Sequence, residues 1–258
     1  MYSDKRTFPV CGGVLIHPEW ILTAAHCLKF LGPDNINPAN PAAVRVQALM
    51  GAFDLSAIDY KGRQYRTIIQ AIAHPLYVYP DPNYDIALFK LDQPVNMVMS
   101  KVGAIVDTIG IQRDEDRGCI ALAGQVCPPS PMPSVGTLGW ITGWGRTRGA
   151  GCTLTGANAS PMLLQQAQVT VSAFGSHTGF CHECGENVVI LTNTDNAHVC
   201  PGDSGGPFSV NYGETGGWQV AGIDSSNGML AGISIYVRVS KFADWICTTT
   251  QANIVGCP

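Results

Sequence analysis

The chain has 258 residues, of which 46% are hydrophobic and 13% are charged, and its formal net charge is −4 at pH 7. This length suits one large all-β domain or two small lobes with a substantial buried core. The weakly negative charge offers no basic field to nucleic acid, so we expect no nucleic-acid partner. No run approaches the ~18 apolar residues of a membrane span, so we expect no membrane partner either.

Ten cysteines, an even number, favour a disulfide framework and an oxidising compartment. We therefore expect a secreted, extracellular protein. Residues 1–6 carry charge and no apolar stretch follows them, so no secretory signal is visible. The expectation is that the chain is incomplete at its start.

Short β-prone runs separated by turn residues occupy most of the chain. A first set, predicted to form an N-terminal lobe, covers residues 12–16, 20–25, 44–49 and 67–72. A second set, predicted to form a C-terminal lobe, covers residues 139–143, 164–171, 187–191, 207–210, 218–224 and 233–239. The proline-rich segment 127–133 fits an extended crossing between the lobes, which places the predicted boundary between 1–126 and 127–258. Residues 241–251 have apolar side chains at helical spacing and predict a C-terminal helix.

Residues 200–207 read Cys-Pro-Gly-Asp-Ser-Gly-Gly-Pro and place Ser204 in a glycine-rich turn. Glycines on both sides allow backbone torsions closed to other residues and remove side chains that would crowd an incoming carbonyl group. Ser204 can then present both its hydroxyl and its own N–H to one substrate atom. Taken alone, the run fits an ordinary surface turn equally well.

A reactive serine needs a base within hydrogen-bond reach and a third group that orients the base. His26 lies among small residues in Thr-Ala-Ala-His-Cys at 23–27 and is the leading base. Asp85 stands at the head of the predicted apolar strand Asp-Ile-Ala-Leu at 85–88, where a half-buried carboxylate can orient an imidazole. Each has a structural alternative, since a lone histidine is more often structural and Asp85 alone fits a turn aspartate. The remaining candidates for structural roles are His17, His74, His177 and His182.

These motifs together resemble the trypsin and chymotrypsin family of serine endopeptidases, in the family's order and spacing. The resemblance extends to four further stretches, at residues 11–16, 142–145, 222–223 and 236–239. It implies an all-β fold of two packed antiparallel β-barrels, followed by a short C-terminal helix. The active site is then expected in the cleft between the two barrels of one peptidase domain.

The resemblance also implies roles for single residues. His26 would take the proton of Ser204 during attack on a peptide carbonyl and then protonate the leaving amine, while Asp85 holds the imidazole tautomer. The backbone N–H groups of Gly202 and Ser204 would form the oxyanion hole. Ser225 resembles the serine that supports the buried carboxylate in this family.

The primary specificity pocket departs from the family pattern. His198 stands where trypsin-like members have the aspartate that selects lysine or arginine. A protonated His198 would accept an acidic side chain and a neutral one a small polar side chain, whereas Asp224 would attract a basic residue. In another interpretation, His198 and Asp224 satisfy each other, and the shape of the pocket determines which substrate side chains it accepts.

The substrate strand departs from the family pattern as well. Ser226 and Asn227 replace an aromatic residue and a glycine, so we expect weak hydrophobic subsites and a narrower mouth of the pocket. The other candidate substrate-binding residues are Val199 and Ser234.

Cysteine placement also differs from the family pattern. Cys11 and Cys27 match the bridge that staples the histidine loop in this family, but Cys200 lacks its usual partner, and Cys152 is a candidate replacement. The Cys-His-Glu-Cys run at 181–184 has the spacing of half a zinc site or a redox pair, yet a second pair at metal spacing is missing. We therefore expect no metal and no cofactor.

In this family a precursor is cut to free an N-terminus whose ammonium pairs with the acid before the nucleophile, here Asp203. Only residues 7–10 lie between Arg6 and Cys11, at most about 14 Å of extended chain. That is too short to reach Asp203, so we expect either an upstream start or an unpaired Asp203.

The expected function is that of a secreted serine endopeptidase, made as a zymogen, that acts as a monomer on protein or peptide substrates. Protein protease inhibitors are a second class of candidate partner. The main alternative is a protease-like binding protein that has no catalytic activity, and a non-peptide esterase is the third hypothesis.

Overall fold

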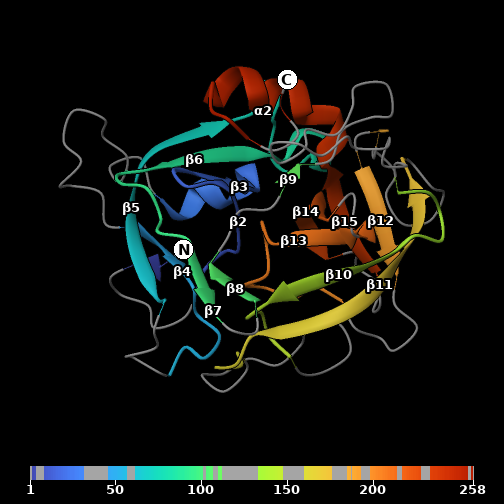
Figure 1. The fold of residues 1–258 in the computed structure, drawn as a ribbon. Helices are drawn as coiled ribbons and strands as arrows, with labels where there is room; N and C mark the ends of the chain where they lie inside the picture. Colours follow the sequence, from blue (N-terminus) through green and yellow to red (C-terminus); the bar gives the residue numbers. More distant parts are fainter. Residues whose placement is uncertain are drawn as a thin grey trace.

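The computed structural model describes residues 2–3, 9–31, 46–56, 62–100, 103–106, 110–111, 133–147, 160–175, 185–186, 188–192, 198–213, 217–227, 233–254 and 257. Two curled, mainly antiparallel sheets lie side by side, one built from strands within residues 2–91 and the other from strands within residues 110–238 (Figure 1). This is the all-β, two-barrel architecture that the sequence predicts. A short strand pair outside these sheets joins β7 (Val98–Ser100) to β8 (Gly103–Val106).

The N-terminal sheet has six strands in the order β1-β4-β5-β6-β3-β2. Their bounds are Tyr2–Ser3 for β1, Val14–His17 for β2, Trp20–Thr23 for β3, Val46–Met50 for β4, Gln64–Ala73 for β5 and Ala87–Leu91 for β6. Strand β3 is buried throughout because it has two apolar faces. Ile21 points into the interior of its own lobe, whereas Trp20 and Leu22 pack into a core shared with the other lobe.

The C-terminal sheet has seven strands in the order β13-β10-β11-β12-β15-β14-β9. Strand β13 pairs with both β10 and β14, so the sheet closes on itself and leaves only β9 outside the ring. The bounds are Gly110–Ile111 for β9, Leu138–Gly143 for β10, Gln165–Phe174 for β11, Val188–Thr192 for β12, Pro207–Asn211 for β13, Trp218–Asn227 for β14 and Ile233–Arg238 for β15. Phe208 and Tyr236 fill its interior, with ring centroids 6.1 Å apart.

One apolar cluster joins the two lobes to the C-terminal helix α2 (Ala243–Thr250). It combines Leu22 and Leu88 of the first sheet with Val237 of the second and Ile246 of the helix. The chain that follows α2 is tied back to it by the disulfide between Cys247 and Cys257. Among the described residues, no helix has the length and apolar character needed to cross a membrane.

The strands predicted from the sequence are present in the described residues, with their ends shifted by a few positions. His17 continues β2, so the turn before β3 consists of Pro18 and Glu19. The predicted helix is present as α2, preceded by the 3-10 helix η5 (Val239–Phe242). The predicted boundary at 126/127 lies outside the described residues.

Truncation of the barrel interior gives a direct test of this packing. Phe208→Ala should lower the free energy of unfolding by about 3–5 kcal/mol, because it removes a fully buried ring and leaves a cavity against Tyr236. The matched control is Leu138→Ala on the neighbouring strand β10, whose side chain is exposed and should contribute less than about 0.5 kcal/mol. Guanidinium unfolding followed by fluorescence measures both, and equal losses would contradict the assigned core.

Candidate active site

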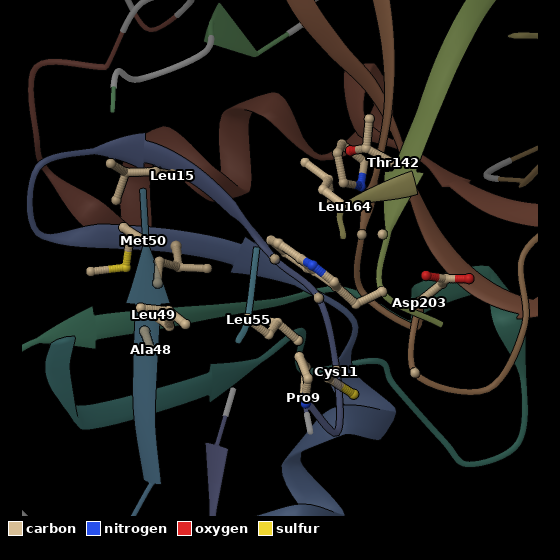
Figure 2. A pocket seen from close by; sticks show the side chains of 18 residues that line it. Pro9, Cys11, Leu15, Ala48, Leu49, Met50, Leu55, Thr142, Leu164 and Asp203 are labelled. Atoms are coloured by element: carbon tan, nitrogen blue, oxygen red, sulfur yellow. The ribbon is translucent and has the colours of Figure 1, made fainter. Parts of the chain in front are cut away.

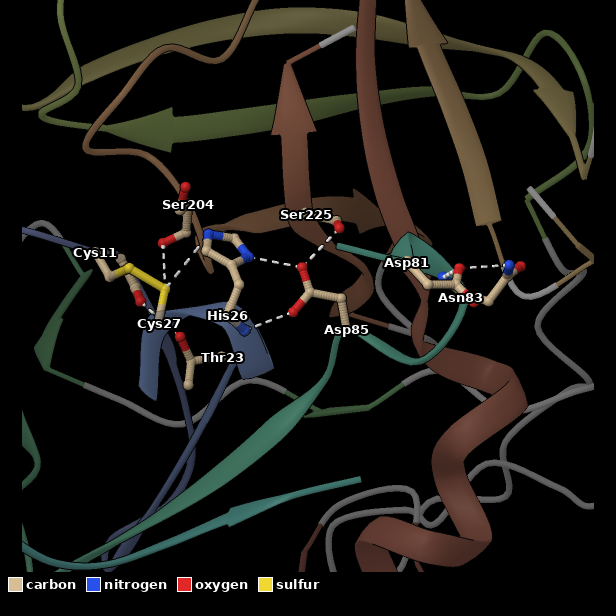
Figure 3. Close-up of polar contacts among 10 residues, drawn as sticks. Cys11, Thr23, His26, Cys27, Asp81, Asn83, Asp85, Ser204 and Ser225 are labelled. Atoms are coloured by element: carbon tan, nitrogen blue, oxygen red, sulfur yellow. Dashed lines mark hydrogen bonds and ion pairs between the residues drawn. A yellow bond between two sulfur atoms is a disulfide. The ribbon is translucent and has the colours of Figure 1, made fainter. Parts of the chain in front are cut away.

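A buried carboxylate organises the N-terminal side of the candidate site. His26 lies in the 3-10 helix η1 (Ala25–Phe30) directly after β3, and Asp85 follows the 3-10 helix η3 (Pro82–Tyr84) before β6. The ring Nδ1 of His26 lies 2.6 Å from Asp85 Oδ2, and the backbone N–H of His26 donates to Asp85 Oδ1 at 2.7 Å (Figure 3). The Ser225 hydroxyl, from β14 of the other lobe, donates to Asp85 Oδ2 at 2.7 Å. The imidazole is therefore held with Nδ1 toward the acid and Nε2 turned away from it.

The backbone of Ser204 is fixed by a contact with the N-terminal lobe. The N–H of Gly12 donates to the Ser204 carbonyl at 2.7 Å. His26 Nε2 lies 3.9 Å from the Sγ of Cys27, and no hydrogen bond joins it to the Ser204 hydroxyl, although both residues are described. Catalytic hydrogen bonds are often long in unliganded enzymes and tighten when substrate binds. The three sequence-predicted residues thus meet at one place, with the serine hydroxyl not yet bonded to the base.

The turn that carries Ser204 leaves two N–H donors unused. Gly202 and Gly205 have φ angles of 109° and 81°, in the region that favours glycine. The neighbouring N–H groups of Asp203 and Gly206 bond to carbonyls within the turn, at 2.9 and 2.8 Å. Within the described part of the chain, the N–H groups of Gly202 and Ser204 make no such bond. The turn can therefore offer both donors to a developing oxyanion.

Asp203 is buried behind this turn. Its carboxylate accepts from the N–H of Gly145 at 2.7 Å and from the N–H of Cys200 at 3.0 Å. Burial raises the pKa of Asp203, while these two hydrogen bonds and the nearby charge of His198 oppose the rise. An added Cβ at Gly143 would collide with the Asp203 carboxylate, so the close approach requires glycine there.

A cavity of about 190 Å³ between the lobes ends at Asp203. Figure 2 shows Asp203 at one side of this cavity and the apolar side chains of Leu15, Met50 and Leu164 around it. Its lining includes neither His26 nor Ser204.

A second cavity, the candidate cleft, has a volume of about 350 Å³ and is lined by His26, Asp85 and Ser204 together. Its other wall is formed by a basic residue and aromatic side chains that the sequence analysis did not single out: Lys29, Phe30, Tyr77 and Tyr79. Lys29 Nζ lies 5.0 Å from the ring centre of Phe30 and 5.7 Å from that of Tyr79. Tyr77 and Tyr79 lie shortly before Asp85 in the sequence. The predicted contact between Asp85 and His26 therefore already indicated that these two tyrosines would lie beside the site.

The candidate specificity residues fall into two groups. The N–H of Val199 donates to the Ser234 hydroxyl at 3.2 Å, so these two lie together, and Val199 lines the cleft. Asp224 is buried opposite Tyr236 in the neighbouring strand, and no hydrogen bond joins it to His198. For Ser226 and Asn227 the structure describes only the strand pairing, with Ile235 and Ser234 respectively.

Two of the cysteines form the bridge that the family resemblance implies. Cys11 and Cys27 are bonded at 1.99 Å, which ties η1 to the chain before β2. Their sulfurs lie near His26 but are bonded to each other, so they are not thiolates that hold a metal. Cys200 is disulfide-bonded as well, whereas Cys152 and the 181–184 run lie outside the described residues.

Comparison with known proteins identifies the family. The family model named Trypsin matches residues 1–246. A tryptase of Mus musculus is 32% identical over 95% of this chain and 80% of the tryptase, and Kallikrein-5 of Homo sapiens is 27% identical over 94% of this chain and 68% of that protein. The solved structure of neuropsin, a serine protease expressed in the limbic system of mouse brain, matches with a TM-score of 0.63 and 25% identity over 93% of this chain and 89% of neuropsin. The chain belongs to the trypsin family and is a serine-type endopeptidase.

The glycine against Asp203 provides a test of the link between this acid and the nucleophile turn. Gly143→Ala should slow labelling of Ser204 by a fluorophosphonate about 100-fold or more, because the displaced carboxylate shifts the turn and its oxyanion donors. Gly136→Ala is the control, since its φ is also positive, at 92°, but nothing lies within 4 Å of the added Cβ. Equal labelling rates for the two variants would contradict the proposed coupling between Asp203 and the turn that carries Ser204.

Proposed function

We propose that this protein is a secreted serine endopeptidase, made as a zymogen, that cleaves peptide bonds through an acyl-enzyme on Ser204. The observation that carries the proposal is the convergence of the His26–Asp85 pair, from one lobe, and the Ser204 turn, from the other, on one cleft. Proton transfer requires the Ser204 hydroxyl to come within hydrogen-bond reach of His26 Nε2.

The reaction follows from the three groups in sequence. His26 takes the hydroxyl proton of Ser204 as the oxygen attacks the peptide carbonyl carbon, and Asp85 stabilises the imidazolium through Nδ1. The carbonyl oxygen, now negative, is held by the N–H groups of Gly202 and Ser204. His26 then gives its proton to the leaving amine as the C–N bond breaks. In the second half, His26 takes a proton from water as the water oxygen attacks the acyl carbon, and it returns that proton to the Ser204 oxygen as the acyl group leaves.

Support for zymogen activation comes from the surroundings of Asp203. Its buried carboxylate has a raised pKa and borders a cavity between the lobes, so an ammonium group entering that cavity would stabilise the charged form. In the family this cation is a newly freed N-terminus, and we assign the same role to Asp203 here.

Secretion is supported by the disulfides, which persist in oxidising compartments. We propose a monomer composed of an N-terminal lobe, 1–126, and a C-terminal lobe, 127–258, that acts on protein or peptide substrates and is open to protein protease inhibitors. The primary specificity pocket is proposed to be non-standard, because His198 stands where tryptic members have an acid.

The alternative of a protease-like binding protein is less well supported. Such proteins typically lack one member of the triad, whereas His26, Asp85 and Ser204 are all present and gathered in one cleft. A non-peptide esterase would use the same acyl chemistry. Turnover of peptide substrates, compared with that of ester substrates, distinguishes a peptidase from such an esterase.

The triad is tested with a fluorophosphonate probe on the processed protein. Wild type should be labelled and Ser204→Ala should not, because the probe bonds to the serine oxygen. Asp85→Asn should lower kcat by about 10⁴-fold, since the amide holds the imidazole in the wrong tautomer. Asp92→Asn, an exposed acid of the same lobe, is the matched control and should retain full activity. An unlabelled wild type beside a reactive control protease would overturn the proposed function.

A further inference from the structure

The segment that carries the base touches the turn that carries the nucleophile. Thr23, the last residue of β3, lies three residues before His26 and is fully buried (Figure 3). Its hydroxyl donates to the Gly12 carbonyl at 2.9 Å, and the N–H of Gly12 donates to the Ser204 carbonyl at 2.7 Å. Two consecutive hydrogen bonds therefore connect the histidine segment to the nucleophile.

The Thr23 hydroxyl also lies directly against the nucleophile turn. A Cβ built on Gly205, the residue after Ser204, would collide with the Thr23 oxygen. A Cβ on Gly12 would lie 3.2 Å from the carbonyl oxygen of Asp203, on the other side of the nucleophile. Because the atoms are this closely packed, a shift of the Thr23 oxygen is passed on to the main chain of the turn.

The orientation of the base depends on other contacts. The N–H and Nδ1 of His26 both bond to Asp85, at 2.7 and 2.6 Å. The contacts with the nucleophile are made at the Ser204 carbonyl, by the N–H of Gly12 and by the Cys27 sulfur at 3.6 Å. Asp85 thus fixes the direction of the imidazole, whereas the distance between base and nucleophile depends on how the two segments are held together.

That distance determines the rate of the proposed reaction. A base must come within about 3.2 Å of the oxygen whose proton it takes. A misplacement of about 1 Å can slow catalysis about 100-fold, even when its cause lies away from the reacting atoms. Thr23 does not line the candidate cleft, so it can affect the reaction only through the main chain that it contacts.

We propose that Thr23 is a positioning residue, whose hydroxyl holds Gly12 so that Ser204 and His26 lie at the distance that proton transfer requires. The inference rests on the proposed function, because it concerns the same proton transfer. A donor is needed at this place, since without it the Gly12 carbonyl loses its hydrogen bond in the interior of the protein. An apolar side chain of the same shape would fill the space and leave Gly12 less firmly held.

Three variants separate the hydroxyl from the space that it occupies. Thr23→Val removes the donor and keeps the shape, Thr23→Ala removes the donor and adds no bulk, and Thr23→Ser keeps the donor. Each reacts with the fluorophosphonate, and its maximal labelling rate and half-saturating concentration are measured separately. We expect valine and alanine to lower the maximal rate about 10- to 100-fold at an unchanged half-saturating concentration, and serine to stay within about threefold of wild type. A slow valine variant beside a full-rate alanine variant would assign the effect to crowding of Gly205 and overturn the role of the hydroxyl.

Thr250→Val is the matched control for stability. Thr250 is buried in α2, and its hydroxyl donates to the Ile246 carbonyl at the same length of 2.9 Å. Neither residue lines the candidate cleft. Loss of this bond should lower the Tm and leave the maximal labelling rate unchanged. If Thr23→Val also lowers the Tm but is labelled at the wild-type rate, Thr23 has a structural role alone and the inference is overturned.

Hydrogen exchange at the Gly12 amide reports on the same connection without any reaction. The N–H of Gly12 should exchange at least about tenfold faster in Thr23→Val and Thr23→Ala than in wild type, because its bond to Ser204 opens more often. Thr23→Ser and Thr250→Val should keep the slow exchange. Unchanged exchange in the first two variants would show that Gly12 is held without Thr23, which contradicts the inference. An unreactive wild-type Ser204 would refute the proposed function, and the exchange rates alone would then decide whether Thr23 joins the two segments.

Discussion

The geometry of this molecule depends on one contact between the main chains of its two lobes. Gly12 donates its N–H to the carbonyl of Ser204, and a Cβ at Gly12 would lie 3.0 Å from the Cα of Gly206. Thr23 braces the same segment, since its hydroxyl donates to the Gly12 carbonyl at 2.9 Å. Backbone atoms on both sides leave no flexible side chain that can move aside. The distance between the nucleophile turn and the histidine helix is therefore set by glycine, and side-chain packing adjusts around it.

Three buried acids around this contact show three ways in which a fold accommodates a carboxylate. Asp85 is surrounded by donors from His26 and Ser225 and joins the lobes. Asp203 is enclosed by main chain, with glycines against it and two N–H donors on it. Asp224 has neither kind of support. The first arrangement positions a base and the second supports a turn, whereas the third leaves a buried carboxyl oxygen without a donor among the described residues.

Much of the fold could be predicted because strand periodicity is local. The strands near His26 and Ser204 carry their apolar pattern within four to ten residues, and the order of the three motifs indicated which segments meet. The 3-10 helix η1 was not predicted, because its conformation depends on the Cys11–Cys27 bridge and on the hydrogen bond from His26 to Asp85. Strands as short as β1 and β9 have too few residues for a period, and they exist only through pairing with β4 and β14.

The site was predictable in its chemistry and less so in its electrostatics. Sequence motifs placed His26, Asp85 and Ser204 together, and the close-up in Figure 3 shows how the first two and Ser225 meet. Whether a given acid is paired depends on which side chains fold against it from distant strands. The sequence analysis left open whether His198 and Asp224 satisfy each other, and in the structure no hydrogen bond joins these two described residues.

The apolar cluster shared by both lobes has a consequence for how substrates enter. Separation of the lobes would expose Trp20 and Leu22 on one side and Val237 and Ile246 on the other, so a hinge opening of the cleft is strongly disfavoured. The enzyme therefore presents a rigid groove, and the polypeptide that it cuts must supply the conformational adjustment. Segments that are already extended, such as exposed loops and unfolded chains, fit that requirement, whereas the helices and sheets of an intact protein have to unravel locally before they can be cleaved.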